Sequence, residues 1–312
     1  MTEIRHYQRF KDYDYSRGAA LFITVTTSPR RQIFGRVTNG RMALSELGQE
    51  ADASIKRVFN SAAITLHRHV VMPDHVHISI YLRPGLENQA AIALLNRTVG
   101  KFKSWINRCW WQYGGEGALW QQGYHDWICV GREMIDSVQR YIDYNPLKWE
   151  LRNNSGLLRM VEPIDSPLLP AGEYWRGIGA LKVLNHARKL VALRISRTNT
   201  PAQLSALCAR MAPKIGQYAF ISGFISAGER QVLELLLESA DSQIIKVSPY
   251  AFPHDYNPPV TWMKAIDDGR MAVIARGNSP EELNRASCLD LNAAIARMAD
   301  KTAYYKAGAF LR

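Results

Sequence analysis

Cysteine is scarce in this chain. Its 312 residues contain four cysteines, Cys109, Cys129, Cys208 and Cys288, and no two of them form a C-x-x-C pair. Cysteines this far apart make neither a zinc ribbon nor the disulfide framework of a small secreted domain. We therefore predict reduced thiols, as is typical of a cytoplasmic protein.

Long apolar runs are also missing. Nowhere do eighteen uncharged apolar residues follow one another, and the opening MTEIRHYQRFKDYDY is polar and charged. The pattern predicts neither a transmembrane helix nor a secretory signal, so we expect a cytoplasmic protein without a membrane partner. We find no internal repeat and no low-complexity tract.

Acidic residues are in the minority. The chain has 28 Asp and Glu against 39 Lys and Arg, a formal net charge of +11, which favours a polyanionic partner. Six of the eight tryptophans fall between Trp105 and Trp149, interleaved with Lys and Arg. Such a mixture can stack unpaired bases and pair with phosphates, but it is equally typical of a large aromatic core.

Two histidines stand out in HVVMPDHVHISIYL, residues 69–82. Side chains alternate along an extended strand, so His75 and His77 share one face while Val76 enters the core. Two neutral imidazoles about 6–7 Å apart along a strand can hold one divalent ion and leave its other positions open. A strand histidine that satisfies a backbone partner is the alternative, and this pattern alone does not decide between them.

A second pattern lies further along the chain. From Met134 to Asn145 apolar residues recur at helical spacing, and Pro146 predicts the end of the helix. Tyr141 and Asn145 stand four residues apart and therefore share one helix face. A phenol there can attack a phosphodiester, and the carboxamide oxygen of Asn145 is a hard metal ligand. The alternative is a core tyrosine followed by an asparagine cap.

With these motifs the chain resembles the single-tyrosine HUH transposases, and within them the REP-associated tyrosine transposases. YDYSRGAALFITVTTSPRRQIFG (13–35) looks like the family's first strand and turn, and MPDHVH (72–77) matches its HUH strand. WQQGYHDWICVGREMIDSVQRYIDYNPLKW (120–149) looks like its tyrosine helix with the approach to it. The similarity extends to near Leu151, about half of the chain.

The resemblance implies a role for each of four residues. Tyr141 would be the nucleophile, and His75, His77 and Asn145 would bind Mg²⁺ or Mn²⁺. It further implies single-stranded or hairpin DNA as substrate, a 5′-phosphotyrosine intermediate and a free 3′-hydroxyl. An ion suits this reaction because a phenol is a weak nucleophile at neutral pH and charge develops on the phosphate.

Three neighbouring residues need their own interpretation. Asp74 stands where the family commonly has asparagine; it changes the charge beside the ligands, or it makes a turn. His67 and His69 form another H-x-H, but the residue between them is not apolar and no family motif covers them. We interpret them as strand residues or phosphate contacts. Related enzymes can work as dimers, and no assembly signal here decides between a monomer and a homodimer.

The length suggests two domains. Residues 153–176 contain three prolines and two glycines without periodicity, so we predict a linker between domains at 1–152 and 177–312. The first domain has strand-like runs and helical stretches in an order that predicts an α+β HUH domain, an antiparallel sheet with helices packed on it. Its strand-like runs are 20–27 and 64–82, and its helical stretches are 45–60, 87–113 and 134–145.

The second domain alternates short apolar strands with helices. This rhythm predicts an α/β Rossmann-like domain with ligands at the carboxyl ends of parallel strands. The strands are expected at 190–196, 218–224, 242–249 and 270–277, and the helices at 201–211, 226–240 and 279–300.

One turn of the second domain, SGFISAGE (222–229), joins a strand directly to a helix. Its small residues can expose backbone amides to a phosphate, or they can merely allow close packing, and no GxxxxGK or GxGxxG is present. Together with ISR (195–197), the turn resembles the Rossmann-like domain of the DNA-processing protein A (Smf) group. That resemblance implies a nucleotide- or single-strand-binding accessory domain. The candidate contacts are Ser196, Arg197, Ser222, Gly223 and Ser226.

Three functions are consistent with these patterns. The first is a metal-dependent, single-strand-specific DNA endonuclease and strand transferase, a transposase. The second is a domesticated, non-catalytic DNA-binding protein that keeps the basic surface. The third gives the carboxyl half a nucleotide-sensing role that regulates the amino-terminal enzyme. The intact set of two histidines, tyrosine and asparagine favours the first.

Overall fold

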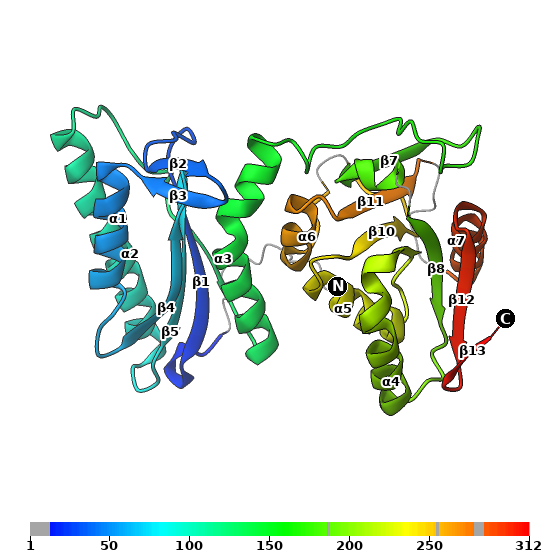
Figure 1. Cartoon of the computed structure of the whole chain (residues 1–312). Helices are drawn as coiled ribbons and strands as arrows, with labels where there is room; N and C mark the ends of the chain where they lie inside the picture. Colours follow the sequence, from blue (N-terminus) through cyan, green and yellow to red (C-terminus); the bar gives the residue numbers. More distant parts are fainter. Residues whose placement is uncertain (1–12, 186–187, 254–255, 278–283, 312) are drawn as a thin grey trace. The chain divides into compact units, whose positions relative to one another are not determined.

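The computed structural model describes residues 13–185, 188–253, 256–277 and 284–311. The chain divides into two compact units, Met1–Glu150 and Leu151–Arg312 (Figure 1). The first contains an antiparallel sheet with helices, and the second contains a sheet with a parallel centre. The expected order of an α+β unit followed by an α/β unit is confirmed.

The described part of the first unit is built on a four-stranded antiparallel sheet, in the order β4-β5-β1-β6. Its strands are β1 (Ala19–Thr26), β4 (Ile64–Val71), β5 (His75–Leu82) and β6 (His125–Ile128). A separate hairpin joins β2 (Gly35–Thr38) to β3 (Arg41–Leu44). Its turn residues Asn39 and Gly40 both have positive φ, 51° and 67°, as a two-residue type I′ turn requires.

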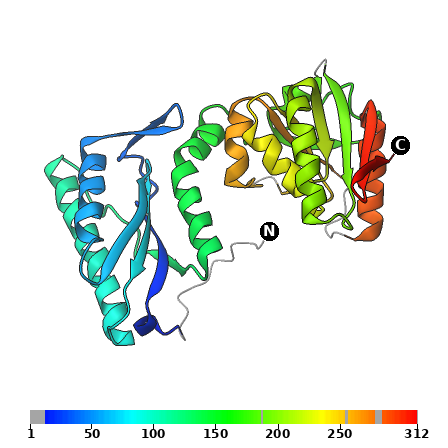
Figure 2. The same ribbon diagram turned by 60° about the horizontal axis from the view of Figure 1, so that its bottom comes forward.

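The sheet of the first unit is covered on both faces (Figure 2). Helices α1 (Glu46–Val58) and α2 (Asn88–Gln112) pack on one face against Val76, Ile78 and Ile80 of β5. Helix α1 begins after Ser45, whose side chain accepts a hydrogen bond from the N–H of Gly48. The other face carries a smaller cluster around Phe22, against which α3 packs. Residues that alternate along β5 therefore face different helices.

Helix α3 is longer than the sequence predicts. It runs from Arg132 to Asn153 and contains Pro146, so the predicted end at that proline is wrong. A proline removes one backbone N–H and crowds the carbonyl four residues earlier, but it does not prevent later residues from continuing the helix. Leu151, in the turn after the proline, is fully buried. Its burial favours continuation.

The described part of the second unit has a seven-stranded sheet in the order β13-β12-β8-β9-β10-β11-β7. Neighbouring strands from β12 to β11 in this order are parallel, and both edge strands are antiparallel to their neighbours. The strands are β7 (Trp175–Gly179), β8 (Lys189–Ile195), β9 (Tyr218–Ser222), β10 (Gln243–Ser248), β11 (Met271–Arg276), β12 (Lys301–Lys306) and β13 (Ala309–Leu311). The four strands expected from the sequence are β8 to β11.

Helices cover both faces of this second sheet (Figure 1). Its α-helices are α4 (Pro201–Met211), α5 (Ala227–Glu238), the short α6 (Met263–Asp267) and α7 (Arg285–Met298). Helix α7 packs on the face that includes Ile221 and Ile245, and α4 and α5 lie on the opposite face. Part of the helix expected at 279–300 falls outside the described residues. Among the described residues the 3₁₀ helices are η1 (Tyr15–Arg17), η2 (Leu181–Asn185), η3 (Ala212–Gln217) and η4 (Val260–Trp262).

The segment 154–174, which connects α3 to β7, packs within the second unit. Leu169 belongs to the same core as Trp175, and Val161 forms an antiparallel bridge with Gly177. Apolar contacts and backbone pairing therefore fix the position of this segment within the second unit. None of the helices that the structure describes is both long and apolar enough to cross a membrane.

Candidate active site

Strand β5 places two histidines on the face of the sheet that α3 covers. The residues between and after them, Val76 and Ile78, belong to the core with α1 and α2, so His75 and His77 point the other way. Both histidines are nearly buried, with 8% and 6% of their surface exposed. The structure thus brings together the two histidines singled out in the sequence.

Each imidazole is held by a different partner at Nδ1. His75 Nδ1 lies 2.5 Å from Asp74 Oδ1, and His77 Nδ1 lies 2.9 Å from Thr24 Oγ1. The two Nε2 atoms lie 3.1 Å apart. Partners at Nδ1 set the tautomer and ring orientation of metal-binding histidines. Both Nε2 atoms are therefore directed at one small volume.

The electrostatics of the site favour a neutral His77 and an ionised Asp74. Burial is the main cause that lowers the pKa of His77 well below its ordinary value, and the charges of His75, Lys148 and Arg30 act in the same direction. Burial opposes ionisation of Asp74, but hydrogen bonds and charges from His75 and Arg30 together lower its pKa. A neutral imidazole keeps a lone pair for a metal.

Helix α3 forms the opposite wall of the site. Tyr141, Asn145 and Trp149 follow each other at four-residue spacing and share one helix face. The ring centroids of Tyr141 and His77 are 5.4 Å apart. Those of Trp149 and His75 are 6.4 Å apart. Asn145 lies between these two contacts along the helix, so we infer that it faces the histidine pair.

Asn145 is a buried polar residue. Only 6% of its surface is exposed, and its Nδ2 has no hydrogen-bond partner among the described residues. Buried polar atoms without a partner are uncommon in folded proteins. The nitrogen and oxygen of an asparagine amide exchange places by a rotation of the group. The residue can therefore present its oxygen at the position that Nδ2 now occupies.

The donor set fits a small divalent ion. Two ligands that are each about 2.1 Å from an ion, at a right angle, are about 3.0 Å apart. The two histidine Nε2 atoms are 3.1 Å apart. Within the described residues no group of three or more His, Cys, Asp or Glu side chains converges. A third protein ligand here would be the asparagine oxygen.

Phe22 and Lys148 complete the surroundings of Tyr141. Phe22 stacks on His77 with centroids 4.9 Å apart and meets the Tyr141 ring edge-on at 5.9 Å. Lys148 Nζ lies 4.9 Å from the centre of the Tyr141 ring. Phe22 was not singled out in the sequence, and Lys148 was counted there only among the basic residues interleaved with the tryptophans. Phe22 lies two residues before Thr24 and so shares its face of β1. Lys148 lies seven residues after Tyr141 and so shares its face of α3. Either spacing could have identified the residue from the sequence.

The other H-x-H pair does not join this site. His69 Nε2 is hydrogen-bonded to Asp52 Oδ1 at 2.7 Å. His67 is exposed, and its ring stacks on Tyr81 at 6.3 Å. An irregularity in the pairing of β4 between Leu66 and Arg68 interrupts the alternation there. These positions agree with their interpretation as strand residues.

The tryptophans of α2 lie away from the histidines. Trp110 packs against the core, whereas Trp105 and Trp111 are 36% and 56% exposed. The Arg57 guanidinium lies 5.0 Å over the Trp105 ring. Because α2 packs on the other face of the sheet, these rings do not line the candidate active site.

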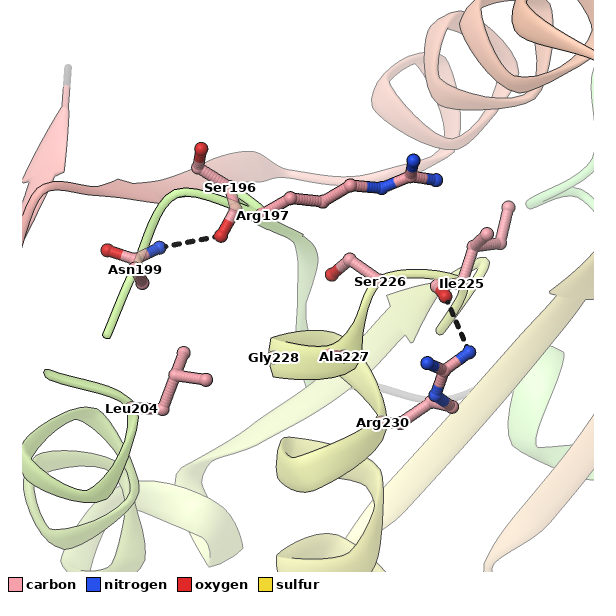
Figure 3. Close-up of a pocket in the computed structure, with 9 residues that line it drawn as sticks. All are labelled: Ser196, Arg197, Asn199, Leu204, Ile225, Ser226, Ala227, Gly228 and Arg230. Atoms are coloured by element: carbon pink, nitrogen blue, oxygen red, sulfur yellow. Dashed lines mark hydrogen bonds between the residues drawn. The ribbon is translucent and has the colours of Figure 1, made fainter. Parts of the chain in front are cut away.

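The second unit has a cavity at the carboxyl ends of β8 and β9 (Figure 3). Its volume is about 440 Å³. Three of the five residues predicted as phosphate contacts line it, namely Ser196, Arg197 and Ser226. Asn199 and Arg230 line it as well and were not predicted. Two arginines therefore give this cavity a positive lining.

The other two predicted contacts, Ser222 and Gly223, serve the local packing. Ser222 is 1% exposed, donates to the carbonyl of Leu193 and accepts from the N–H of Phe224. A Cβ at Gly223 would lie 2.9 Å from Leu291. The structure does not bring these two residues into the cavity lining.

Two backbone amides just before α5 are bonded to the chain's own carboxylate. Glu229 Oε2 accepts from the N–H groups of Ile225 and Ser226, at 2.8 and 3.2 Å, and Oε1 accepts from that of Ile195 at 3.3 Å. Ser226 Oγ accepts from the N–H of Glu229. This is a capping box, and the S-x-x-E spacing at 226–229 is its sequence signal. The amides of Ile225 and Ser226 are therefore already paired with this carboxylate.

Residues 24–145 match the family model described as "Transposase IS200 like". The match begins at Thr24, the partner of His77, and ends at Asn145. The first unit is similar to the IS200-like transposases. The resemblance to transposases inferred from the sequence is thus confirmed for this part of the chain, and the matched region contains His75, His77, Tyr141 and Asn145.

Comparisons with individual proteins cover about half of the chain each. A protein of Haemophilus influenzae described as uncharacterized is 24% identical over 161 residues, 46% of this chain and 88% of its own. A solved REP-associated tyrosine transposase bound to a REP hairpin is 17% identical, with a TM-score of 0.31 over 51% of this chain and 78% of its own. DNA processing protein A from Helicobacter pylori, solved for its single-stranded DNA binding mode, is 16% identical, with a TM-score of 0.35 over 48% and 72%.

Proposed function

We propose that this protein is a metal-dependent endonuclease and strand transferase for single-stranded DNA, with Tyr141 as its nucleophile. The observation that carries the proposal is the meeting of two elements. The paired histidines of β5 face the Tyr141–Asn145 side of α3, with the rings of His77 and Tyr141 5.4 Å apart. The similarity of residues 24–145 to IS200-like transposases supports the same class of reaction.

The proposed reaction is a transesterification. The phenol oxygen of Tyr141 attacks a phosphorus of the DNA backbone, a Tyr–O–P bond forms and the P–O3′ bond breaks. The phenol proton passes to water, and the leaving 3′ oxygen takes up a proton. The products are a 5′-phosphotyrosine and a free 3′-hydroxyl. One phosphate ester bond replaces another in this step. A 3′-hydroxyl can therefore later reverse it and join a strand without another energy source.

The residues that would hold the ion are His75, His77 and Asn145, and the ion would be Mg²⁺ or Mn²⁺. When bound, it supplies positive charge that polarises the scissile phosphate. The protein contributes orientation: Asp74 and Thr24 hold the two rings through Nδ1. Phe22 packs against both His77 and Tyr141 and so keeps strand and helix in register.

The proposed substrate is hairpin or other single-stranded DNA. The formal charge of +11 favours a polyanion, and a solved protein of similar type was bound to a REP hairpin. A domesticated, non-catalytic DNA-binding protein is the alternative. The convergence of both histidines with Tyr141 and Asn145 favours the enzyme.

The test is the formation of a covalent adduct. Purified protein is incubated with end-labelled hairpin oligonucleotides from its own flanking DNA, with Mn²⁺ or with EDTA. We expect a denaturation-resistant adduct only with Mn²⁺ and its loss in Tyr141→Phe. Tyr144→Phe is the matched control, because it removes a hydroxyl from the same helix one turn away. Tight binding without any adduct would support the non-catalytic alternative.

For the second unit we propose an accessory site for a nucleic-acid or nucleotide phosphate in the cavity of Ser196, Arg197 and Ser226. Arg197 and Arg230 support it through their charge, whereas the amides of Ile225 and Ser226 are paired with Glu229. Native mass spectrometry of the purified protein would detect a retained nucleotide. Arg197→Gln should lower binding of that nucleotide or of single-stranded DNA by about tenfold. An unchanged affinity for both the nucleotide and single-stranded DNA would rule out this site.

A further inference from the structure

Lys148 lies on the same wall of the candidate active site as Tyr141. It follows Tyr141 by two helical turns on α3, and its Nζ is 4.9 Å from the centre of the phenol ring. It is half-buried. The ammonium group therefore lies beside the phenol that is proposed to attack the phosphate.

A phosphate attacked by Tyr141 has to lie in that space. It must reach the phenol oxygen on one side and the histidine pair on the other. The two non-bridging oxygens of the phosphate gain charge as the new bond forms, and one ion facing the histidines neutralises only part of it. A second cation beside the phenol would meet the remaining charge. An ammonium group is suited to this because it is a compact charge with three donors.

The other cations around the site have different partners. Arg30 Nη1 lies 3.4 Å from Asp74 Oδ2, on the strand side. Arg68 pairs with Asp143 at 3.7 Å on the surface, and both side chains are about half exposed, at 54% and 49%. Lys148 is the cation that the described contacts place against the nucleophile's ring.

We propose that Lys148 is a further catalytic residue, whose ammonium group binds a non-bridging oxygen of the scissile phosphate. This role rests on the proposed function of Tyr141. The competing explanation is that Lys148 only packs on the tyrosine ring as a cation–π contact, which would stabilise the helix without touching DNA. The two explanations differ in whether the effect of Lys148 depends on the charge of one phosphate.

The experiment compares two hairpin substrates. One has a normal phosphodiester at the cleavage position mapped with the unaltered protein, and the other has an uncharged methylphosphonate there. Lys148→Met keeps the length of the side chain and removes its charge, and Lys148→Arg restores a cation. Arg132→Met is the matched control, since it removes one charge from the first turn of the same helix at a side chain that is 93% exposed.

We expect Lys148→Met to slow adduct formation on the phosphodiester by about 100-fold, with partial recovery in Lys148→Arg and little change in Arg132→Met. In a Tyr141→Phe background, where no cleavage occurs, Lys148→Met should weaken binding of the phosphodiester by about tenfold. On the methylphosphonate the same change should weaken binding less than about twofold. Circular dichroism and the thermal midpoint verify that each variant is folded.

Equal weakening on both substrates, or no slowing of adduct formation, would show that Lys148 does not contact the scissile phosphate. These results would leave the role of Tyr141 intact. If the unaltered protein forms no adduct with any hairpin, both the proposed function and the role of Lys148 are wrong.

Discussion

Thr24 Oγ1 lies 2.9 Å from His77 Nδ1, and the antiparallel register of β1 and β5 puts the two residues directly opposite each other. The orientation of one proposed metal ligand is thus set by a hydroxyl group on the neighbouring strand. One face of the His77 ring stacks on Phe22. The histidine is therefore held from two sides by residues of the same strand.

Thr24→Val removes this hydroxyl with little change in volume. Partners of ligating histidines typically contribute 10- to 100-fold to metal affinity, so we expect the Mn²⁺ concentration for half-maximal adduct formation to rise by about that factor. The rate at saturating Mn²⁺ should change less. Titration of Mn²⁺ against adduct formation measures both, with the exposed Thr38→Val as control. An unchanged Mn²⁺ requirement would argue against a coupling of Thr24 to the ion.

Asn145→Ala tests the third ligand. Because Nδ2 of Asn145 has no hydrogen-bond partner in the part of the chain that the structure describes, its removal should change the free energy of unfolding by only about 1 kcal/mol. Loss of a ligand should nevertheless raise the Mn²⁺ requirement by about tenfold or more. Urea unfolding and the Mn²⁺ titration separate the two effects. A large loss of stability with normal Mn²⁺ dependence would instead assign Asn145 a structural role.

The candidate site could be predicted from local spacing to a large extent. His75 and His77 share a face because strands alternate, and Tyr141 and Asn145 share a face because helices repeat every 3.6 residues. The meeting of these two faces depends on the packing of α3 on the sheet, which periodicity does not contain. The family resemblance supplied that step before the structure did.

Other features depend on pairing or on partners distant in the sequence. The contact of Thr24 with His77 needs the strand register, and the burial of Leu151 is what carries α3 past Pro146. Strand β12 was missed because KTAYYK is mostly polar and has no apolar run. Glu229 was overlooked although its capping-box spacing is visible in the sequence.

Glu229→Ala frees the backbone N–H groups of Ile225 and Ser226, just before α5, and that of Ile195, at the end of β8. We expect a loss of about 1–2 kcal/mol in the free energy of unfolding, since a cap is removed and buried donors lose their partner. The same change should increase the affinity of the cavity for inorganic tripolyphosphate, because the amides become available and a negative charge disappears. Calorimetric titration measures the affinity and urea unfolding measures the stability. For both quantities Glu229→Gln should lie between the unaltered protein and Glu229→Ala. Lower affinity in Glu229→Ala would place the anion elsewhere.

Because of the buried Lys246, we expect the free energy of unfolding to rise with pH. Its Nζ donates to the carbonyls of Gly223 and Val247, and burial lowers its pKa from 10.5 to about 8, against the smaller opposing effect of Glu229. Between these two values the unfolded chain binds a proton that the folded chain does not, so the free energy of unfolding should increase with pH, by at most about 3 kcal/mol.

Lys246→Met tests this directly. The unfolding free energy of the unaltered protein minus that of Lys246→Met should increase from about pH 7.5 to about pH 10. Urea unfolding at both pH values measures it, and the subtraction removes the contribution of other titrating groups. Parallel pH dependence in the two proteins would contradict the low pKa of Lys246.

The division between the two units falls at Glu150 and Leu151, inside helix α3, which ends at Asn153. Five residues separate Asn145 from the first residue of the second unit. A first unit that is produced alone should therefore extend to Asn153, because a chain that stops at Glu150 would cut short the helix that carries the proposed nucleophile.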